Sequence, residues 1–159
     1  MIQAVGMSVG EGDKAPDFSL PASGGRSVSL KGMQGKPFVL YFYPKADTSG
    51  CTQQACAFQA ALPQFKGIEV IGVSPDAIKP IEKFAAKYSL TFPLASDAAK
   101  TVAEAYGVWV EKSMYGRKYM GIERSTFLID GTGTVARAWH KVKVADHAAA
   151  VMAAAKALG

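Results

Sequence analysis

The sequence predicts a mixed α/β domain in which helices cover both faces of a central sheet. Two uninterrupted apolar runs, 38–43 and 68–73, are typical of strands that are buried on both sides. A segment whose apolar residues recur at helical spacing follows each run. Near the C-terminus, two further strand-like segments flank a tight turn at 130–133, which indicates an antiparallel hairpin. Together these three observations favour one mixed sheet.

Length and composition fit a single domain that spans residues 1–159. The chain has 49% hydrophobic and 19% charged residues, which is ordinary for a globular protein. Residues 1–13 read as a loose N-terminal leader without the pattern of a secretory signal, so we expect a cytoplasmic protein. No apolar stretch approaches the ~20 residues of a membrane span. The net charge of +5 comes from scattered Lys and Arg residues, so we expect no nucleic-acid partner.

The first predicted element is an N-terminal β-hairpin. Residues 17–20 and 27–30 alternate polar and apolar side chains, and Gly24 and Gly25 lie in the turn between them. A second turn at 31–36 then leads into the first buried strand.

A helix is predicted to begin at Cys51, after a polar loop. Pro63 kinks or ends this helix, because proline removes a backbone hydrogen bond. Its apolar positions are Phe58, Ala61, Leu62 and Phe65.

The second buried strand, 68–73, leads into a second helix. Ser74 to Asp76 are predicted to cap this helix, and Pro80 suits its first turn. The expected buried face comprises Ile81, Phe84, Ala85 and Tyr88.

Shorter elements follow. Residues 92–95 are a short strand or extended link, and Asp97 can cap a short helix that Gly107 ends. Residues 108–123 hold two extended pieces around a loop at 113–116.

The C-terminal part contains the predicted hairpin and the last helix. The hairpin strands are 125–129 and 134–140. Asp146 is predicted to cap the last helix. The buried stripe of that helix comprises Ala148, Val151, Met152, Ala155 and Leu158.

Both cysteines of the chain lie close to the first buried strand, and Cys51 is the better placed for chemistry. The nucleophilic form of cysteine is the thiolate, and backbone N–H groups at a helix N-terminus point toward such an anion. The Thr48 hydroxyl can turn toward the same point, and the rigid ring of Pro44 can shield it from water. This stretch lacks a cation that would clearly stabilise the thiolate. The candidates are Lys45 and an arginine from another strand.

Cys56 follows Cys51 by five residues on the same predicted helix. Residues at that spacing lie roughly 8.5 Å apart at Cα, whereas a disulfide requires about 7 Å or less. A bond between the two therefore requires the first turns of the helix to unwind. Two cysteines do not supply the four ligands of a structural zinc site, and we expect no metal or cofactor.

The segment 44–51 matches the pattern P-x-x-x-T-x-x-C and resembles the active site of the peroxiredoxins. The pair Cys51 and Cys56 is similar to that of the bacterioferritin-comigratory-protein group, also called peroxiredoxin Q. Segments 72–76 (GVSPD) and 124–130 (RSTFLID) also resemble that group. The resemblance extends from about Gly12 to the end of the chain.

The resemblance implies a thioredoxin-like fold and a role for each matched residue. Cys51 would be the peroxidatic cysteine and Cys56 the resolving one. Thr48 would hydrogen-bond the thiolate and the peroxide, Pro44 would shield the thiolate, and Arg124 would supply the missing cation. The implied substrates are hydrogen peroxide and organic hydroperoxides, and the implied electron donor of this expected monomer is thioredoxin or a similar dithiol.

Two positions depart from the group. Ser49 stands where proline is frequent, which predicts a looser loop before Cys51. Gln54 stands where glutamate is frequent, which predicts the loss of a polar contact near the arginine. Both departures bear on rate and loop rigidity, since the reactive positions are intact.

Alternatives to a peroxidase remain at this point. A protein thiol–disulfide oxidoreductase normally uses C-x-x-C, so the spacing here disfavours it. A redox switch or holdase would use the same unwinding to expose apolar side chains. Cys51 as an inert core thiol is the plainest alternative. His140 and His147 are expected to be exposed and outside the site.

Overall fold

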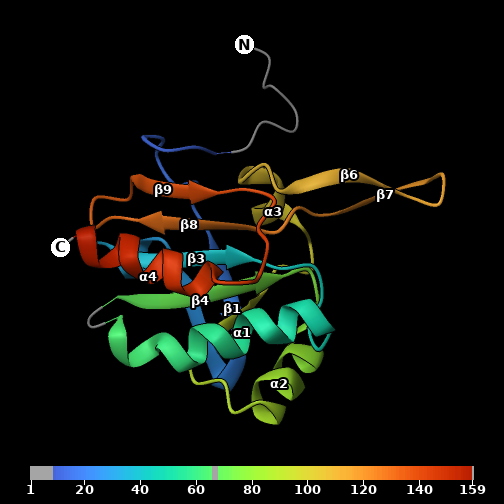
Figure 1. Cartoon of the computed structure of the whole chain (residues 1–159), viewed down its shortest axis with the longest axis horizontal. Helices are drawn as coiled ribbons and strands as arrows, with labels where there is room; N and C mark the ends of the chain where they lie inside the picture. The colour runs from blue at the N-terminus through green and yellow to red at the C-terminus, as the bar shows by residue number, and fades with distance from the viewer. Residues whose placement is uncertain (1–8, 66–67, 159) are drawn as a thin grey trace.

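In a computed structural model, residues 9–65 and 68–158 are described, and they form a mixed sheet flanked by helices (Figure 1). Within this part of the chain the sheet has seven strands in the order β2-β1-β5-β4-β3-β8-β9. The bounds of these strands are β1 Ser19–Ala22, β2 Arg26–Ser29, β3 Phe38–Phe42, β4 Glu69–Ser74, β5 Leu94–Ser96, β8 Ser125–Ile129 and β9 Val135–Trp139.

Strand β3 lies inside the sheet, as the apolar run predicts. It pairs in parallel with β4 and antiparallel with β8, so that Leu40 lies between Ile71 and Phe127. All five of its residues are buried. The side chains alternate between the two faces, with Val39 and Tyr41 in one core and the other three residues in the second. This strand therefore anchors the loop that follows it on both sides.

Helices cover both faces of the sheet, which confirms the predicted architecture. The helices α1 (Ser49–Ala61), α2 (Ile78–Lys87) and α4 (His147–Leu158) pack on one face, and α3 (Thr101–Ala105) packs on the other. A 3₁₀ turn at Leu62–Gln64, which contains Pro63, ends α1 as predicted. The N-terminal hairpin of β1 and β2 is also confirmed, with Leu20 opposite Val28.

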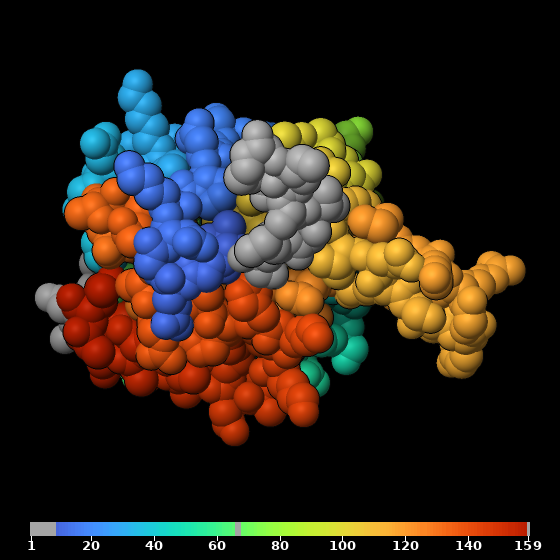
Figure 2. All heavy atoms as spheres, turned by 90° about the horizontal axis from the view of Figure 1, so that it is seen from above, coloured from blue at the N-terminus to red at the C-terminus, as the bar shows by residue number. Residues whose placement is uncertain are grey.

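A two-stranded ribbon of β6 (Trp109–Met114) and β7 (Arg117–Ile122) projects from the body of the protein (Figures 1 and 2). Tyr115, at its turn, is 98% exposed. In Figure 1 the ribbon projects on the side toward which β3 runs. The C-terminal end of β3 and the base of the ribbon thus share one side of the molecule.

The prediction that Ser74 to Asp76 cap α2 is wrong. No side chain caps α2, and the Asp76 carboxylate instead accepts hydrogen bonds from the Ala46 N–H at 2.7 Å and the Ser74 hydroxyl at 2.8 Å. The contact to Ala46 ties the loop before α1 to the end of β4. Asp97 caps α3 as predicted, because its carboxylate accepts hydrogen bonds from two N–H groups of that helix.

The two ends of the chain differ in part from expectation. Residues 1–8 of the predicted leader lie outside the described residues. Within 9–13, the Val9 N–H donates to the Tyr106 carbonyl at 3.2 Å and the Gly12 N–H donates to the Val135 carbonyl at 2.8 Å. Leu158 was expected in the buried stripe of α4 and is exposed. Among the described helices, none has the length and apolar character to cross a membrane.

Candidate active site

The connection from β3 to α1 places Cys51 inside the protein. Helix α1 begins at Ser49, two residues before the predicted start at Cys51, so that Cys51 lies within its first turn. The side chain of Cys51 is 1% exposed and packs in the core between α1 and the sheet. A thiol in this position is near the N–H groups that a helix leaves unpaired at its start. Burial of this thiol also keeps it from bulk water.

Arg124, in the link between β7 and β8, supplies the cation that the local sequence lacks. Its Nη2 donates to Cys51 Sγ at 3.3 Å, and its Nη1 donates to the Gln54 amide oxygen Oε1 at 2.5 Å. The planar guanidinium fork thus reaches two partners on one helix, which a lysine ammonium does less well. Lys45, the other candidate cation, is exposed.

Gln54 makes a polar contact with Arg124, whereas its difference from the glutamate of the group predicted that this contact is lost. This prediction is wrong, because the amide oxygen accepts the Arg124 hydrogen bond where a carboxylate would. Gln54 is 1% exposed, and its Nε2 has no hydrogen-bond partner among the described residues. As a neutral partner, Gln54 orients the guanidinium without adding a negative charge beside it.

Gly50 makes room for this arginine. A Cβ atom at this position would lie 3.3 Å from Arg124 Nη2, which is closer than side chains normally approach. The lack of a side chain therefore matters for the approach of the guanidinium to the sulfur. No sequence pattern indicates this role, since a glycine within a helix has no characteristic pattern of its own.

Thr48 precedes α1 and contributes its backbone to the helix. Its carbonyl accepts a hydrogen bond from the Thr52 N–H at 2.8 Å, and its hydroxyl donates to the Lys45 carbonyl at 2.9 Å. The hydroxyl makes no capping hydrogen bond to the helix. None of the hydrogen bonds in the described residues joins this hydroxyl to Cys51. Because its proton is used toward Lys45, its oxygen can still accept a hydrogen bond.

Contacts to neighbouring elements hold the loop that leads to Cys51. Pro44 follows β3 and is half-buried. Asp47 has a left-handed backbone with φ of 61°, and its carboxylate accepts from Lys87 Nζ at 3.0 Å and from the Tyr88 hydroxyl at 2.9 Å. These bonds, with the one from Ala46 to Asp76, fix the loop to α2 and β4.

Cys56 lies beyond Cys51 on the same continuous helix. Both cysteines are free thiols, and Cys56 is half-buried. The spacing on an intact helix keeps their Cα atoms beyond bonding range, as the sequence predicts.

A histidine that was expected at the surface lies beneath the site. His147, the first residue of α4, is buried, so this expectation is wrong. Its Nε2 shares a 2.8 Å hydrogen bond with the Thr126 hydroxyl, and its ring meets the edge of Phe58 in α1. Burial lowers the pKa of His147 to about 4, with a further contribution from the Arg124 charge. His147 is therefore neutral at physiological pH.

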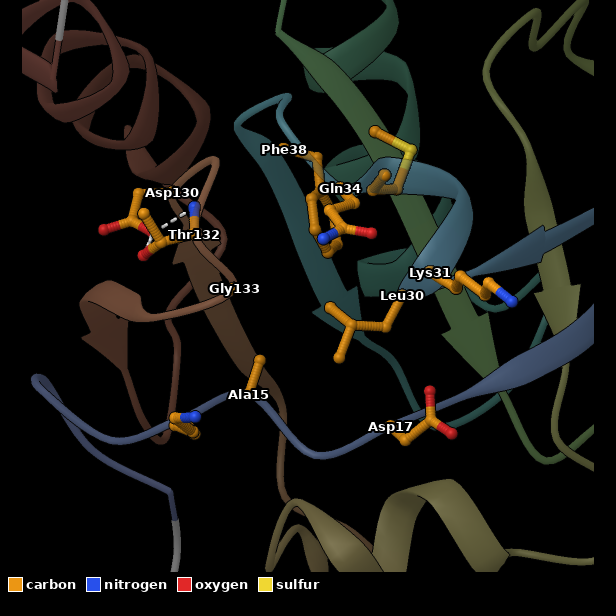
Figure 3. Close-up of a pocket in the computed structure, with 11 residues that line it drawn as sticks. Ala15, Asp17, Leu30, Lys31, Gln34, Phe38, Asp130, Thr132 and Gly133 are labelled. Atoms are coloured by element: carbon orange, nitrogen blue, oxygen red, sulfur yellow. Dashed lines mark hydrogen bonds between the residues drawn. The ribbon is translucent and has the colours of Figure 1, made fainter.

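Two cavities bear on the location of the site. One of about 380 Å³ lies beside Arg124, between the ribbon and the segment after β9. Another, of about 460 Å³, is lined by Phe38 at the start of β3 and by Asp130 and Thr132 (Figure 3). None of the predicted site residues lines the second cavity. Cys51 thus lies at the opposite end of β3 from it.

Comparison with known proteins agrees with this geometry. Residues 11–138 match the model of the AhpC/TSA family. The chain belongs to the AhpC/TSA family of peroxiredoxins. It is 49% identical over 148 residues to a putative peroxiredoxin bcp of Coxiella burnetii, a match that covers 92% of this chain and 98% of the relative. It is 47% identical over 145 residues to peroxiredoxin Bcp of Bacillus subtilis, which covers 90% of this chain and 92% of the relative.

Solved structures place the chain in the bacterioferritin-comigratory-protein, or peroxiredoxin Q, group. A mutant of peroxiredoxin Q from Xanthomonas campestris superposes with a TM-score of 0.85 at 46% identity, covering 89% of this chain and 92% of that one. A mutant of PrxQ from Xylella fastidiosa gives 0.89 at 39% identity, covering 95% and 98%. The fold is therefore thioredoxin-like, and this peroxiredoxin is a peroxidase that acts on peroxides.

Proposed function

We propose that the chain is a thiol-dependent peroxidase in which Cys51 reduces hydrogen peroxide and organic hydroperoxides. The observation that carries this proposal is the contact of Arg124 Nη2 with a buried sulfur, at 3.3 Å, in the first turn of a helix. The bacterioferritin comigratory protein of Xanthomonas campestris, whose structure is solved, has alkyl peroxide reduction activity. That relative, 46% identical to this chain, supports the inclusion of organic hydroperoxides.

In the first step the Cys51 thiolate attacks one oxygen of the peroxide. The S–O bond forms as the O–O bond breaks, and the leaving oxygen takes a proton and departs as water or an alcohol. Arg124 stabilises the negative charge on the sulfur before the attack and on the oxygens during it. The oxygen of the Thr48 hydroxyl accepts a hydrogen bond from the peroxide O–H, and Pro44 limits the access of water.

In the second step Cys56 attacks the sulfenic acid on Cys51. A disulfide forms and water leaves. Both cysteines stay oxidised until a dithiol such as thioredoxin reduces the disulfide by thiol exchange. The first turns of α1 must unwind for this step. Gln59 anchors the later part of α1, which supports unwinding of the first turns alone. Its amide oxygen accepts a hydrogen bond from the Thr91 N–H at 2.8 Å, and its amide nitrogen donates to the Thr91 hydroxyl at 2.9 Å. The end of α1 beyond Cys56 therefore stays attached. The enzyme works as a cytoplasmic monomer in this proposal.

Intact-protein mass spectrometry tests both steps. Reduced protein mixed with one equivalent of hydrogen peroxide should lose two hydrogens, while Cys56→Ser should gain one oxygen and Cys51→Ser should remain unchanged. A stable gain of one oxygen in the unaltered protein would reject Cys56 as the resolving thiol. If Cys51→Ser is oxidised as fast as the unaltered protein, the assignment of Cys51 is wrong.

The reductant is tested separately. Thioredoxin with its reductase should sustain peroxide-dependent NADPH oxidation by the unaltered protein and not by Cys51→Ser. Reduction by monothiols alone, with no turnover by thioredoxin, would contradict this part of the proposal.

A further inference from the structure

The cavity of about 380 Å³ beside Arg124 has an unusual charge composition. It adjoins the reactive thiol through Arg124, whose guanidinium contacts Cys51. Three cations and two carboxylates line it together with two valines. These residues are Val110, Glu111, Lys112, Glu123, Arg124, Lys141 and Val142.

One of the two carboxylates is ion-paired, whereas two of the cations form no ion pair. Glu111 lies 3.6 Å from Lys118 Nζ, and Glu123 lies 3.7 Å from a ring nitrogen of His140, which is charged only when it is protonated. Across the residues that the structure describes, neither Lys112 nor Lys141 forms an ion pair. The cavity therefore carries a net positive charge next to Arg124.

The ribbon holds Lys112 in place. In the register of the ribbon Lys112 lies opposite Tyr119, so both side chains project from the same face. Gly121 leaves space for them, since a Cβ there would lie 3.2 Å from Lys112 Cδ and 3.4 Å from a Tyr119 ring carbon. Burial lowers the pKa of Lys112, and the charge of Arg124 lowers it further, while Glu123 and Cys51 oppose this shift. Lys112 is thus a partly desolvated cation with a packed stem.

Lys141 is placed by the backbone next to it. The N–H of Val142 donates to the Arg124 carbonyl at 2.9 Å, which fixes this segment beside the arginine. Lys141 itself has a left-handed backbone with φ of 51°. The two lysines come from segments far apart in the sequence and line the same cavity.

We propose that this cavity binds a negatively charged group on the substrate, so that a hydroperoxide carrying a carboxylate is preferred over its neutral counterpart. Lys112 and Lys141 bind the carboxylate, while the O–O group lies at Cys51 on the other side of the Arg124 guanidinium. The volume is within the range of small-molecule sites and admits a group of the size of benzoate. This inference rests on the proposed peroxidase function and specifies its substrate class.

A matched pair of hydroperoxides tests the inference. Cumene hydroperoxide and its para-carboxylate derivative have the same O–O group and ring and differ in charge. We expect the charged compound to have a kcat/KM about fivefold higher at low salt, which is what one ion pair in a solvated site provides. The preference should fall toward one as salt screens the lysines. The ratio of the two constants cancels any change in the reactivity of Cys51 itself.

Lys112→Gln should reduce this ratio several-fold. The matched control is Arg117→Gln, which removes one positive charge from the same ribbon, outside the cavity, and should leave the ratio unchanged, because Arg117 forms no ion pair among the described residues. An unaltered protein that shows no preference, or a ratio equally affected by the two substitutions, overturns the inference. In either case reduction of the neutral compound leaves the peroxidase proposal intact.

Binding without turnover separates the two proposals further. In Cys51→Ser protein, 4-isopropylbenzoate should bind and shift the NMR signals of the cavity residues, and Lys112→Gln should weaken that binding several-fold. Absence of binding refutes the anion site whatever the peroxidase assays give. Conversely, peroxide reduction that persists in Cys51→Ser refutes the peroxidase assignment and the substrate preference with it.

Discussion

Replacing Arg124 by Met should slow the reaction of Cys51 with hydrogen peroxide by about two to three orders of magnitude. The substitution keeps an unbranched side chain of similar length and removes the charge 3.3 Å from Sγ. At that separation Coulomb's law gives about 5 kcal/mol with an effective dielectric constant of about 20 and about 1 kcal/mol in bulk water. These limits correspond to losses of about tenfold to several thousandfold. The loss of one preorganised hydrogen-bond donor in other enzymes lies within this range.

The assay follows sulfenic acid formation in a Cys56→Ser background, so that the product of the first step accumulates. Rapid mixing, quenching and intact mass give the second-order rate constant. Arg124→Lys should recover little of the rate, because a single ammonium cannot reach Gln54 Oε1 and Cys51 Sγ with the geometry of the guanidinium fork.

The control is Arg137→Met, which removes an exposed arginine that lies 3.4 Å from Glu11 and stacks on Trp139. It should change the rate constant by less than about twofold, since the contacts of Arg137 among the described residues are with Glu11 and Trp139 and not with the site. Circular dichroism and thermal unfolding verify that each variant is folded. If folded Arg124→Met reacts within about threefold of its parent, the contact to the sulfur does not account for the reactivity of Cys51.

Three further predictions concern stability, the loop and the arginine. His147 is protonated near pH 6.5 in the unfolded chain and near pH 4 in the folded protein, so the free energy of unfolding should fall by about 3 kcal/mol as the pH drops between these values. Urea unfolding of His147→Asn should lack this part of the pH dependence. The same dependence of the unfolding free energy on pH in both proteins would contradict the prediction. Asp47→Ala removes the contact of the loop with Lys87, so the first turns of α1 should unwind more easily and Cys56 should reach the sulfenic acid sooner. The yield of sulfinic acid at high peroxide, measured by mass spectrometry, should then fall roughly threefold, and Lys87→Met, which removes the same contact, should have the same effect. An unchanged yield would show that the loop does not limit unwinding. Gly50→Ala should stabilise the helix by roughly 0.5–1 kcal/mol in thermal unfolding yet slow peroxide reduction about tenfold, because its Cβ displaces the Arg124 guanidinium; a stable variant at full rate would refute this role.

The sequence was informative where the determining interactions are local. The run Phe38–Phe42 predicted a strand buried on both faces because its side chains are apolar at every position, whichever way each points. Pro63 ended α1 through the backbone hydrogen bond that proline cannot make. The position of Cys51 in the first turn of a helix was predictable for the same reason, since the loop and that turn lie within a few residues of each other.

Only the tertiary structure decided the interactions that join distant segments. Arg124 is 73 residues from Cys51 in the chain, so that only the resemblance to the group indicated it, and the antiparallel pairing of β3 with β8 brings the two together. Local sequence could not predict that Gln54 binds this arginine, because that requires the relative position of α1 and the start of β8. His147 reads as a surface residue in the sequence, yet the packing of α4 on α1 buries it. Periodicity and loop chemistry act along the chain, whereas the cation, its neutral partner and the lysine-lined cavity depend on how the sheet assembles.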